Sequence, residues 1–203
     1  FLLNIVLDLG ITNYNVKNIS QHHDLFQKYF SGIITLRLFL VFVYLIITFC
    51  IAFVIGYDNY QFKLLLILAV NQSLVAFILY MRSNLAGLHL FFQDSIISVL
   101  DKLLLIIICS VLLWGSVFNQ PFQIEWFIYS QTVSYFITLC VCVILLIRQT
   151  KRFVFHFSPL FAVTILKNSF PYAMLILLMT IYYRIDSIML ERMLDDNSQA
   201  GIY

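Results

Sequence analysis

The fold is decided by residues 33–56, IITLRLFLVFVYLIITFCIAFVIG, where Arg37 is the one charged side chain in a long apolar run. A helix needs about 20 such residues to cross the hydrocarbon core of a bilayer. Within lipid, backbone amides and carbonyls must be paired inside the segment, and an α-helix does this. The stretch therefore predicts a transmembrane helix, and it leaves Arg37 to be explained.

The whole chain has the composition of a membrane protein. Of its 203 residues, 62% are hydrophobic and 11% are charged, whereas about a quarter are charged in soluble domains. Further apolar runs predict spans at 63–82, about 96–117, 126–148 and 171–192. Residues 1–12 are apolar but too short to span, so we interpret them as the end of a truncated helix in a fragment of a longer protein. The predicted fold class is all-α, a polytopic transmembrane helix bundle.

Lysine and arginine in the loops set the orientation, because cytoplasmic loops carry the excess of positive charge. One side of the predicted membrane holds seven of these residues, namely Lys17, Lys28, Arg82, Arg148, Lys151, Arg152 and Lys167. The other side holds two, Lys63 and Arg192. The side with seven is therefore predicted to be cytoplasmic.

Two cytoplasmic segments have amphipathic patterns. Ile19, Phe26 and Phe30 recur at near-helical spacing in the first loop, and residues 152–167 mix basic and aromatic side chains. We expect both segments to lie along the inner membrane surface, with simple connections between spans as the alternative. Pro171 is expected in the first turn of the last span, where a helix tolerates proline.

Ionisable side chains inside the spans are the candidate functional residues, because they are costly in a membrane. Asp8 and Arg37 stand at similar depths in antiparallel neighbours, so we expect an ion pair between them. Asp101 and Lys102 lie one to two turns inside the third full span. Since adjacent residues on a helix do not face each other, we expect each to have a different partner. For Arg37 and Lys102, the alternative is a stem that snorkels to the interface.

The last span carries Arg184 and Asp186 at greater depth. Positions two apart project about 200° apart on an α-helix, so these two do not pair with each other. Arg184 shares a narrow polar stripe with Thr180 and Ser187, which we interpret as facing a wet cavity. Asp186 shares the opposite face with Tyr182 and Tyr183 and is expected to contact a tyrosine or a neighbouring helix. Two interhelical ion pairs with purely structural roles are the alternative.

The sequence lacks the motifs of soluble catalytic and metal sites. Its four cysteines lie in apolar runs without metal-ligand spacing, and we interpret them as small apolar side chains. Adjacent histidines diverge on a helix, so residues 22–24, HHD, are interpreted as a solvated loop. We expect no catalytic residues, no metal, no cofactor and no nucleic-acid partner.

Three stretches carry a resemblance to a known family. Residues 7–20, LDLGITNYNVKNIS, look like the second helix and first cytoplasmic loop of polysaccharide flippases in the multidrug/oligosaccharidyl-lipid/polysaccharide exporter superfamily. Residues 82–106, RSNLAGLHLFFQDSIISVLDKLLLI, are similar to the loop between their helices four and five. Residues 169–203 resemble helix seven and the start of helix eight, with the pattern RxD…L…aGxY. The order of the three stretches carries the resemblance.

The resemblance implies two pseudo-symmetric helical bundles around a central cavity. This chain would supply one incomplete six-helix bundle plus the first helix of a second. Residues 1–148 would then belong to the N-terminal bundle without its first helix, 149–170 would be a cytoplasmic linker, and 171–203 would form the first helix of the C-terminal bundle and the following periplasmic loop.

The resemblance also implies a function. Such a protein flips undecaprenyl-diphosphate-linked oligosaccharide across the bacterial inner membrane by alternating access, for surface polysaccharide export. Its partners would be this cargo, membrane lipids and the glycan polymerase machinery. The alternatives are a cation-coupled multidrug antiporter of the same superfamily, a membrane enzyme of glycan assembly and a purely structural membrane subunit.

A diphosphate cargo would need fixed cations in a water-filled vestibule, and arginine suits phosphate through bidentate hydrogen bonds. The candidate cargo-binding residues are Arg37, Arg82, Lys102 and Arg184. The candidate acids for ion coupling or for structural pairing are Asp8, Asp101 and Asp186.

Overall fold

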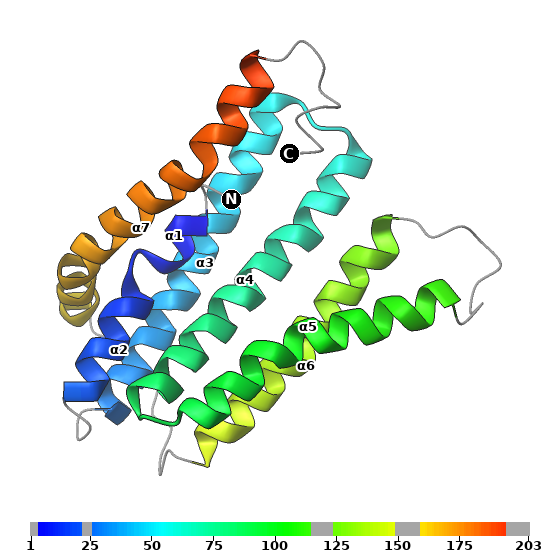
Figure 1. Ribbon diagram of the computed structural model, residues 1–203. Coiled ribbons are helices and arrows are strands. Elements are labelled where there is room, and N and C mark those ends of the chain that lie inside the picture. Colours follow the sequence, from blue (N-terminus) through cyan, green and yellow to red (C-terminus); the bar gives the residue numbers. More distant parts are fainter. Residues whose placement is uncertain (1–3, 22–25, 115–123, 149–158, 194–203) are drawn as a thin grey trace.

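The computed structural model describes residues 4–21, 26–114, 124–148 and 159–193, without the side chains of residues 4–5, 26–28, 184 and 186–193. In these ranges the regular structure is entirely helical (Figure 1). The helices are α1 (Asn4–Asp8), α2 (Ile11–Gln21), α3 (Phe26–Ile55), α4 (Asn59–Gly87), α5 (Phe91–Trp114), α6 (Ile124–Ile147) and α7 (Pro159–Met193).

Five of these helices, α3 to α7, are long and apolar enough to cross a membrane. They correspond to the five predicted spans, so the predicted fold class, an all-α polytopic bundle, is confirmed. Two boundaries differ by more than five residues. The third helix begins at Phe26 rather than at residue 33, and α7 begins at Pro159 rather than at residue 171. The first difference matters for function, because it places Arg37 deeper inside its helix than the sequence suggested.

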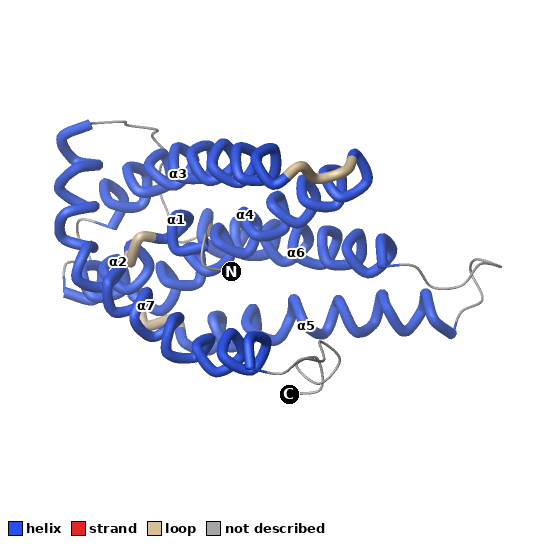
Figure 2. The backbone as a smooth tube through the Cα atoms, turned by 90° about the horizontal axis from the view of Figure 1, so that it is seen from above, coloured by secondary structure: helices blue, strands red, loops and turns tan. Residues whose placement is uncertain are grey.

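The helices are arranged in the order α3, α4, α6 and α5 across the molecule (Figure 2). Helix α1 packs against α3 and α4, α2 packs against α4, and α7 packs mainly against α2, with smaller contacts to α1 and α3. The main core lies where α2, α3, α4, α6 and α7 meet, and its most buried members include Ile11, Ile33, Tyr80 and Leu85. By contrast, α5 buries only Ile97 among its side chains. The fold thus has a tightly packed side around α2, α3 and α4 and an open edge at α5.

The short helix α2 is part of this core, which differs from the surface position expected for the first loop. Ile11, Asn15 and Ile19 are each at most 1% exposed. A Cβ atom added to Gly87 would lie 2.9 Å from Ile19 Cβ, so α2 and α4 approach closely. The Asn15 amide donates to Ser83 Oγ and Asn84 Oδ1, both at 3.1 Å. These polar partners on α4 hold α2 in the bundle, because an unpaired amide in an apolar environment is costly.

The α1–α2 corner rests directly on α7. Leu9 and Gly10 have positive φ angles of 43° and 73° and separate the two helices. A Cβ atom on Gly10 would lie 2.6 Å from the Ser169 carbonyl oxygen, which leaves no room for a side chain. Pro171 lies inside α7 rather than in its first turn, so that prediction is wrong. The first position of α7 is taken by Pro159. Proline suits this position because a backbone amide there would have no acceptor within the helix.

Candidate functional site

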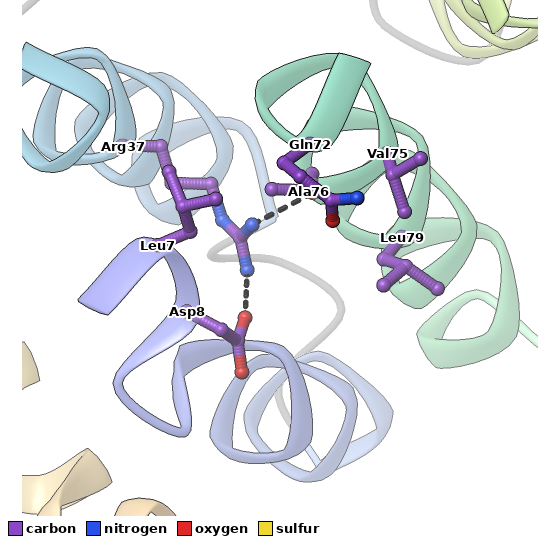
Figure 3. Close-up of a pocket in the computed structure, with 7 residues that line it drawn as sticks. All are labelled: Leu7, Asp8, Arg37, Gln72, Val75, Ala76 and Leu79. Atoms are coloured by element: carbon purple, nitrogen blue, oxygen red, sulfur yellow. Dashed lines mark hydrogen bonds and ion pairs between the residues drawn. The ribbon is translucent and has the colours of Figure 1, made fainter. Parts of the chain in front are cut away.

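Arg37 is the centre of a buried polar cluster in the middle of the packed side (Figure 3). The residue is 1% exposed. One terminal nitrogen donates to Asp8 and to Thr12 Oγ1 at 2.6 Å, and the other donates to the Ala76 carbonyl oxygen at 2.8 Å. The predicted Asp8–Arg37 ion pair is therefore confirmed. The alternative of a snorkelling Arg37 is excluded, because its charged end is held inside the bundle.

The local sequence explains why Asp8 faces Arg37. Asp8 ends α1, and its carboxylate accepts hydrogen bonds from the backbone amide of Thr12 at 3.2 Å and from the Thr12 hydroxyl. An aspartate just before a helix commonly accepts from first-turn amides in this way. Because Gly10 permits the sharp corner, Asp8 can serve the first turn of α2 and pair with α3 at the same time.

Tyr80 closes the cluster on the α4 side. The Arg37 Cζ atom lies 4.8 Å from the centre of the Tyr80 ring, a distance at which a cation is attracted to the ring face. The Tyr80 hydroxyl donates to the Phe30 carbonyl oxygen at 2.9 Å, and the Asn84 amide donates to the Tyr80 carbonyl oxygen at 2.7 Å. The polar contacts thus continue from Arg37 to the Asn15–Asn84 pair.

The depth of Arg37 makes this pairing necessary. At about 1.5 Å per residue, Arg37 stands about 12 Å from Tyr29, where the spanning part of α3 begins. An unpaired charge at such a depth would cost several kcal/mol. Asp8 compensates the charge, and of the three Arg37 guanidinium nitrogens Nε is buried without a hydrogen-bond partner among the described residues.

A small recess lies beside the ion pair, between α1, α3 and α4 (Figure 3). Its lining combines two charged groups and one amide with apolar side chains, namely Leu7, Asp8, Arg37, Gln72, Val75, Ala76 and Leu79. Its empty space is about 310 Å³ including the open mouth. That is enough for water but not for a lipid-linked oligosaccharide. The small recess and the hydrogen bonds made by both terminal nitrogens of Arg37 favour a structural role for this residue. Cargo binding by Arg37 stays a prediction.

Lys102 and Asp101 form the second charged group within the spans, on α5. Lys102 Nζ lies 3.1 Å from Asp101 Oδ2, so the expectation that each has a different partner is wrong. The Cα–Cβ bonds of adjacent helical residues do point apart, but the flexible four-carbon stem of lysine bends back far enough to reach the neighbouring carboxylate. The ammonium also lies 5.7 Å from the centre of the Tyr135 ring.

The surroundings of this second pair are open. The Lys102 side chain is 63% exposed, and that of Asp101 is 17% exposed. The Asp101 backbone is tied to α6, because the Ser134 hydroxyl donates to its carbonyl oxygen at 2.5 Å. Lys102 stands about 17 Å along α5 from Phe91, close to the middle of this helix. Since its ammonium is held at the level of Asp101, it does not snorkel to the interface.

Arg82 forms a third pair near the adjoining ends of α4 and α5. Its Nε atom lies 2.6 Å from Asp94 Oδ1, and the two side chains are 28% and 23% exposed. Sequence reasoning named Arg82 but missed Asp94. It also missed Thr12 and Tyr80. Thr12 could have been found, because it stands four residues after Asp8 in the segment 1–12 that the sequence predicts as one helix, where such positions are neighbours. Tyr80 and Asp94 are brought in by tertiary packing that has no local signal.

The remaining predicted residues lie outside the described side chains. Arg184 and Asp186 lie in α7, but the structure describes only their backbone. Residues 22–24 lie outside the described residues. Tyr182 and Tyr183 are 74% and 71% exposed. Among the described residues, no three His, Cys, Asp or Glu side chains are grouped so that they could hold a metal ion.

Five long apolar helices with paired charges between them define a multi-pass membrane protein. Residues 1–203 match the family described as polysaccharide biosynthesis protein, and the chain belongs to that family. It is therefore a membrane protein of polysaccharide biosynthesis or export, in agreement with the resemblance to polysaccharide flippases. No match was found among curated proteins or among solved structures.

Proposed function

We propose that this protein moves an oligosaccharide linked to undecaprenyl diphosphate from the cytoplasmic to the periplasmic leaflet of the bacterial inner membrane by alternating access. Membership of the polysaccharide biosynthesis family supports the class of cargo. The five spanning helices support a location in a membrane. In this proposal the protein is a transporter rather than an enzyme. The translocated oligosaccharide is passed to the glycan polymerase machinery on the periplasmic side.

The observation that carries the proposal is a set of cations at successive depths. Arg82 lies about 8 Å along α4 from its cytoplasmic end at Gly87, and Lys102 lies about 17 Å along α5 from Phe91. Each is partly exposed and paired with one carboxylate. Such cations suit a diphosphate, because hydrogen bonds in which a partner is ionised are shorter and stronger than neutral ones.

The carboxylates have a role in the unloaded protein. An isolated cation inside a membrane protein would be strongly destabilising, and a nearby Asp offsets that cost. Asp94 and Asp101 can do this for Arg82 and Lys102 until an anionic head group arrives. The third cation, Arg37, has its terminal nitrogens committed to three neighbours, and we assign it to holding the bundle together.

Deletion of the gene in the source bacterium tests the proposal. We expect loss of surface glycan and accumulation of complete oligosaccharide on undecaprenyl diphosphate, measured by mass spectrometry of the lipid extract. The complete protein should restore export, and so should Lys63→Gln, which changes an exposed cation near the opposite end of α4.

The alternatives give different results. An enzyme of glycan assembly would leave incomplete oligosaccharides on the lipid. A drug antiporter would leave the lipid-linked pool and the surface glycan unchanged while raising drug sensitivity. Either outcome contradicts the proposed function.

A further inference from the structure

Helices α1 and α2 meet at a strained corner (Figure 1). Its two residues, Leu9 and Gly10, have φ angles of 43° and 73°. Glycine adopts such a conformation readily, whereas the Cβ atom of a leucine comes too close to the following carbonyl oxygen, which lowers the population about tenfold. Strain of this kind persists only where the surrounding structure enforces it. The corner is therefore held by its neighbours rather than by its own sequence.

The same residues can form one continuous helix. Residues 4–21 contain no proline, and a helix tolerates their single glycine, Gly10, at a modest cost. Such a helix would be about 26 Å long from its first to its last residue. A straight arrangement is thus available to the chain as soon as the contacts that hold the corner are lost.

The first of these contacts is made by the Asp8 carboxylate. In a continuous helix the Thr12 amide would donate to the carbonyl oxygen of residue 8, and here it donates to the Asp8 side chain at 3.2 Å. Arg37 fixes this carboxylate through their ion pair and also donates to the Thr12 hydroxyl at 2.6 Å. The Asp8 side chain thus takes the place of a helical acceptor and stabilises the bent form.

The second contact is made by α7, which lies directly against Gly10. A Cβ atom on Gly10 would lie 2.4 Å from the Ala173 backbone nitrogen and 2.6 Å from the Ser169 carbonyl oxygen. Both α7 residues have small side chains and are buried, Ser169 completely. Because a close-packed contact transmits displacement, the shape of the corner and the position of α7 depend on each other.

This contact is the last firm hold on α7. Among the described side chains of α7, Ala173 is the last one that is buried, and those at 174–183 and 185 are exposed or partly exposed. Pro171 lies at the same level. It has no amide to donate to the carbonyl oxygen four residues earlier, so the helix is weakened there. Release of the corner would therefore free the second half of α7.

We infer that the α1–α2 corner is a two-position joint that controls α7. In the bent position it clamps α7 through Gly10, and in the straight position residues 4–21 form one helix and the second half of α7 changes its angle to the bundle. Strain at Leu9 favours the straight position, whereas the Asp8 contact and the close fit to α7 favour the bent one. That the movement accompanies passage of a cargo rests on the proposed function.

Distances between spin labels in the complete protein test the joint. In a variant without the four native cysteines, labels are placed at positions 4 and 21 and measured by pulsed electron paramagnetic resonance in lipid nanodiscs. We expect two distances, the longer near about 26 Å. Leu9→Gly relieves the strain and should raise the ratio of bent to straight protein about tenfold. Leu9→Asn should act in the same direction, because asparagine tolerates this φ.

Changes at Gly10 should shift the ratio the other way. Gly10→Ala favours the straight position, since alanine suits a helix but suits neither a φ of 73° nor the contact with α7. Gly56→Ala is the matched control, because Gly56 has a φ of 78° and nothing within 4 Å of an added Cβ, and it should leave the ratio unchanged. A single distance that no variant at 9 or 10 changes overturns the joint.

A second pair of labels tests the link to α7. Positions 53 and 182 lie toward the C-terminal ends of α3 and α7, where Phe53 and Tyr182 are 83% and 74% exposed. We expect Gly10→Ala to broaden the distribution of distances between these labels and Leu9→Gly to narrow it. An unchanged distribution in variants whose corner distance has shifted overturns the control of α7.

These readouts do not depend on the cargo. A joint that moves in a protein whose deletion leaves the lipid-linked glycan unchanged supports the inference and contradicts the proposed function. A rigid corner together with accumulation of lipid-linked glycan in the deletion strain supports the proposed function and overturns the inference.

Discussion

Arg37 and Lys102 are both cations well inside spanning helices, and both are paired with an aspartate. Arg37 is 1% exposed and is held by α1, α2 and α4, whereas the Lys102 side chain is 63% exposed and its ion pair stays within α5. Depth and charge are similar, but the number of helices tied together differs. A cation tied to several helices stabilises the bundle, and a cation tied to its own neighbour is available to a ligand.

The surroundings of the two cations explain this difference. Around Arg37, the corner at Gly10 brings Asp8 and Thr12 within reach, and α4 contributes the Ala76 carbonyl oxygen. Around Lys102, helix α5 lies at the edge of the bundle and contributes little to the core. The same residue classes therefore acquire different roles from the packing around them.

The sharpest way to break the comparison is Arg37→Met. We expect a loss of about 3–5 kcal/mol in the free energy of unfolding, because Asp8 would be left as an unpaired charge inside the bundle. Denaturant or thermal unfolding of the purified protein in detergent measures this. A loss below about 1 kcal/mol, the range of a surface ion pair, would contradict the structural role of Arg37.

A double-mutant cycle sharpens the same point. Asp8→Asn combined with Arg37→Met removes both charges, so we expect the double variant to be clearly more stable than the sum of the two single losses predicts. Coupling between contacting residues is about 0.5–3 kcal/mol. Simple additivity would mean that the two side chains act independently.

The corner that positions Asp8 gives the next largest effect. Gly10→Ala should destabilise by about 1–3 kcal/mol, because alanine is strained at a positive φ and its Cβ would meet the backbone of α7. Gly56 is a matched control, since it has a φ of 78° but nothing within 4 Å of an added Cβ. Gly56→Ala should therefore cost only about 1 kcal/mol. Equal losses would show that contact with α7 is unimportant.

The polar contact between α2 and α4 gives a smaller effect. Asn15→Ala should cost about 0.5–2 kcal/mol, because Ser83 and Asn84 each lose a donor in a buried environment. Asn13, on the exposed side of α2, is the control, and Asn13→Ala should change unfolding by less than about 0.5 kcal/mol. The same unfolding measurement decides; a neutral Asn15→Ala would mean that α2 is held by apolar packing alone.

Lys102→Gln should have the smallest effect on stability, within about 0.5 kcal/mol, because it removes one largely exposed ion pair. Its melting temperature in detergent should match that of the unchanged protein. A large loss of stability would place Lys102 in the same class as Arg37.

Much of the fold could be predicted from the sequence. The five spans follow from apolar length, and the Asp8–Arg37 pair follows from equal depth in antiparallel neighbours. Side-chain reach and tertiary contact were harder to predict. The lysine stem reaches Asp101 despite the angle between their Cα–Cβ bonds, and Asp94 meets Arg82 across the turn between α4 and α5.

The start of α7 and the position of α2 were also misjudged, for identifiable reasons. Residues 152–167 mix basic and aromatic side chains, so the start of α7 resembled a connecting segment, and Pro171 resembled a helix start. The polar character of residues 11–21 suggested a surface loop, but Asn15 finds partners on α4. Contacts between residues far apart in the sequence, such as Asn15 with α4 and Gly10 with Ser169 in α7, cannot be recognised from the local pattern of side chains.

The most direct test of the division between Arg37 and Lys102 is the amount of lipid-linked oligosaccharide in cells whose protein carries Lys102→Gln. We expect accumulation of undecaprenyl-linked glycan and loss of surface glycan, at unchanged protein level and melting temperature. Normal export by a well-folded Lys102→Gln protein would contradict a role of Lys102 in cargo binding.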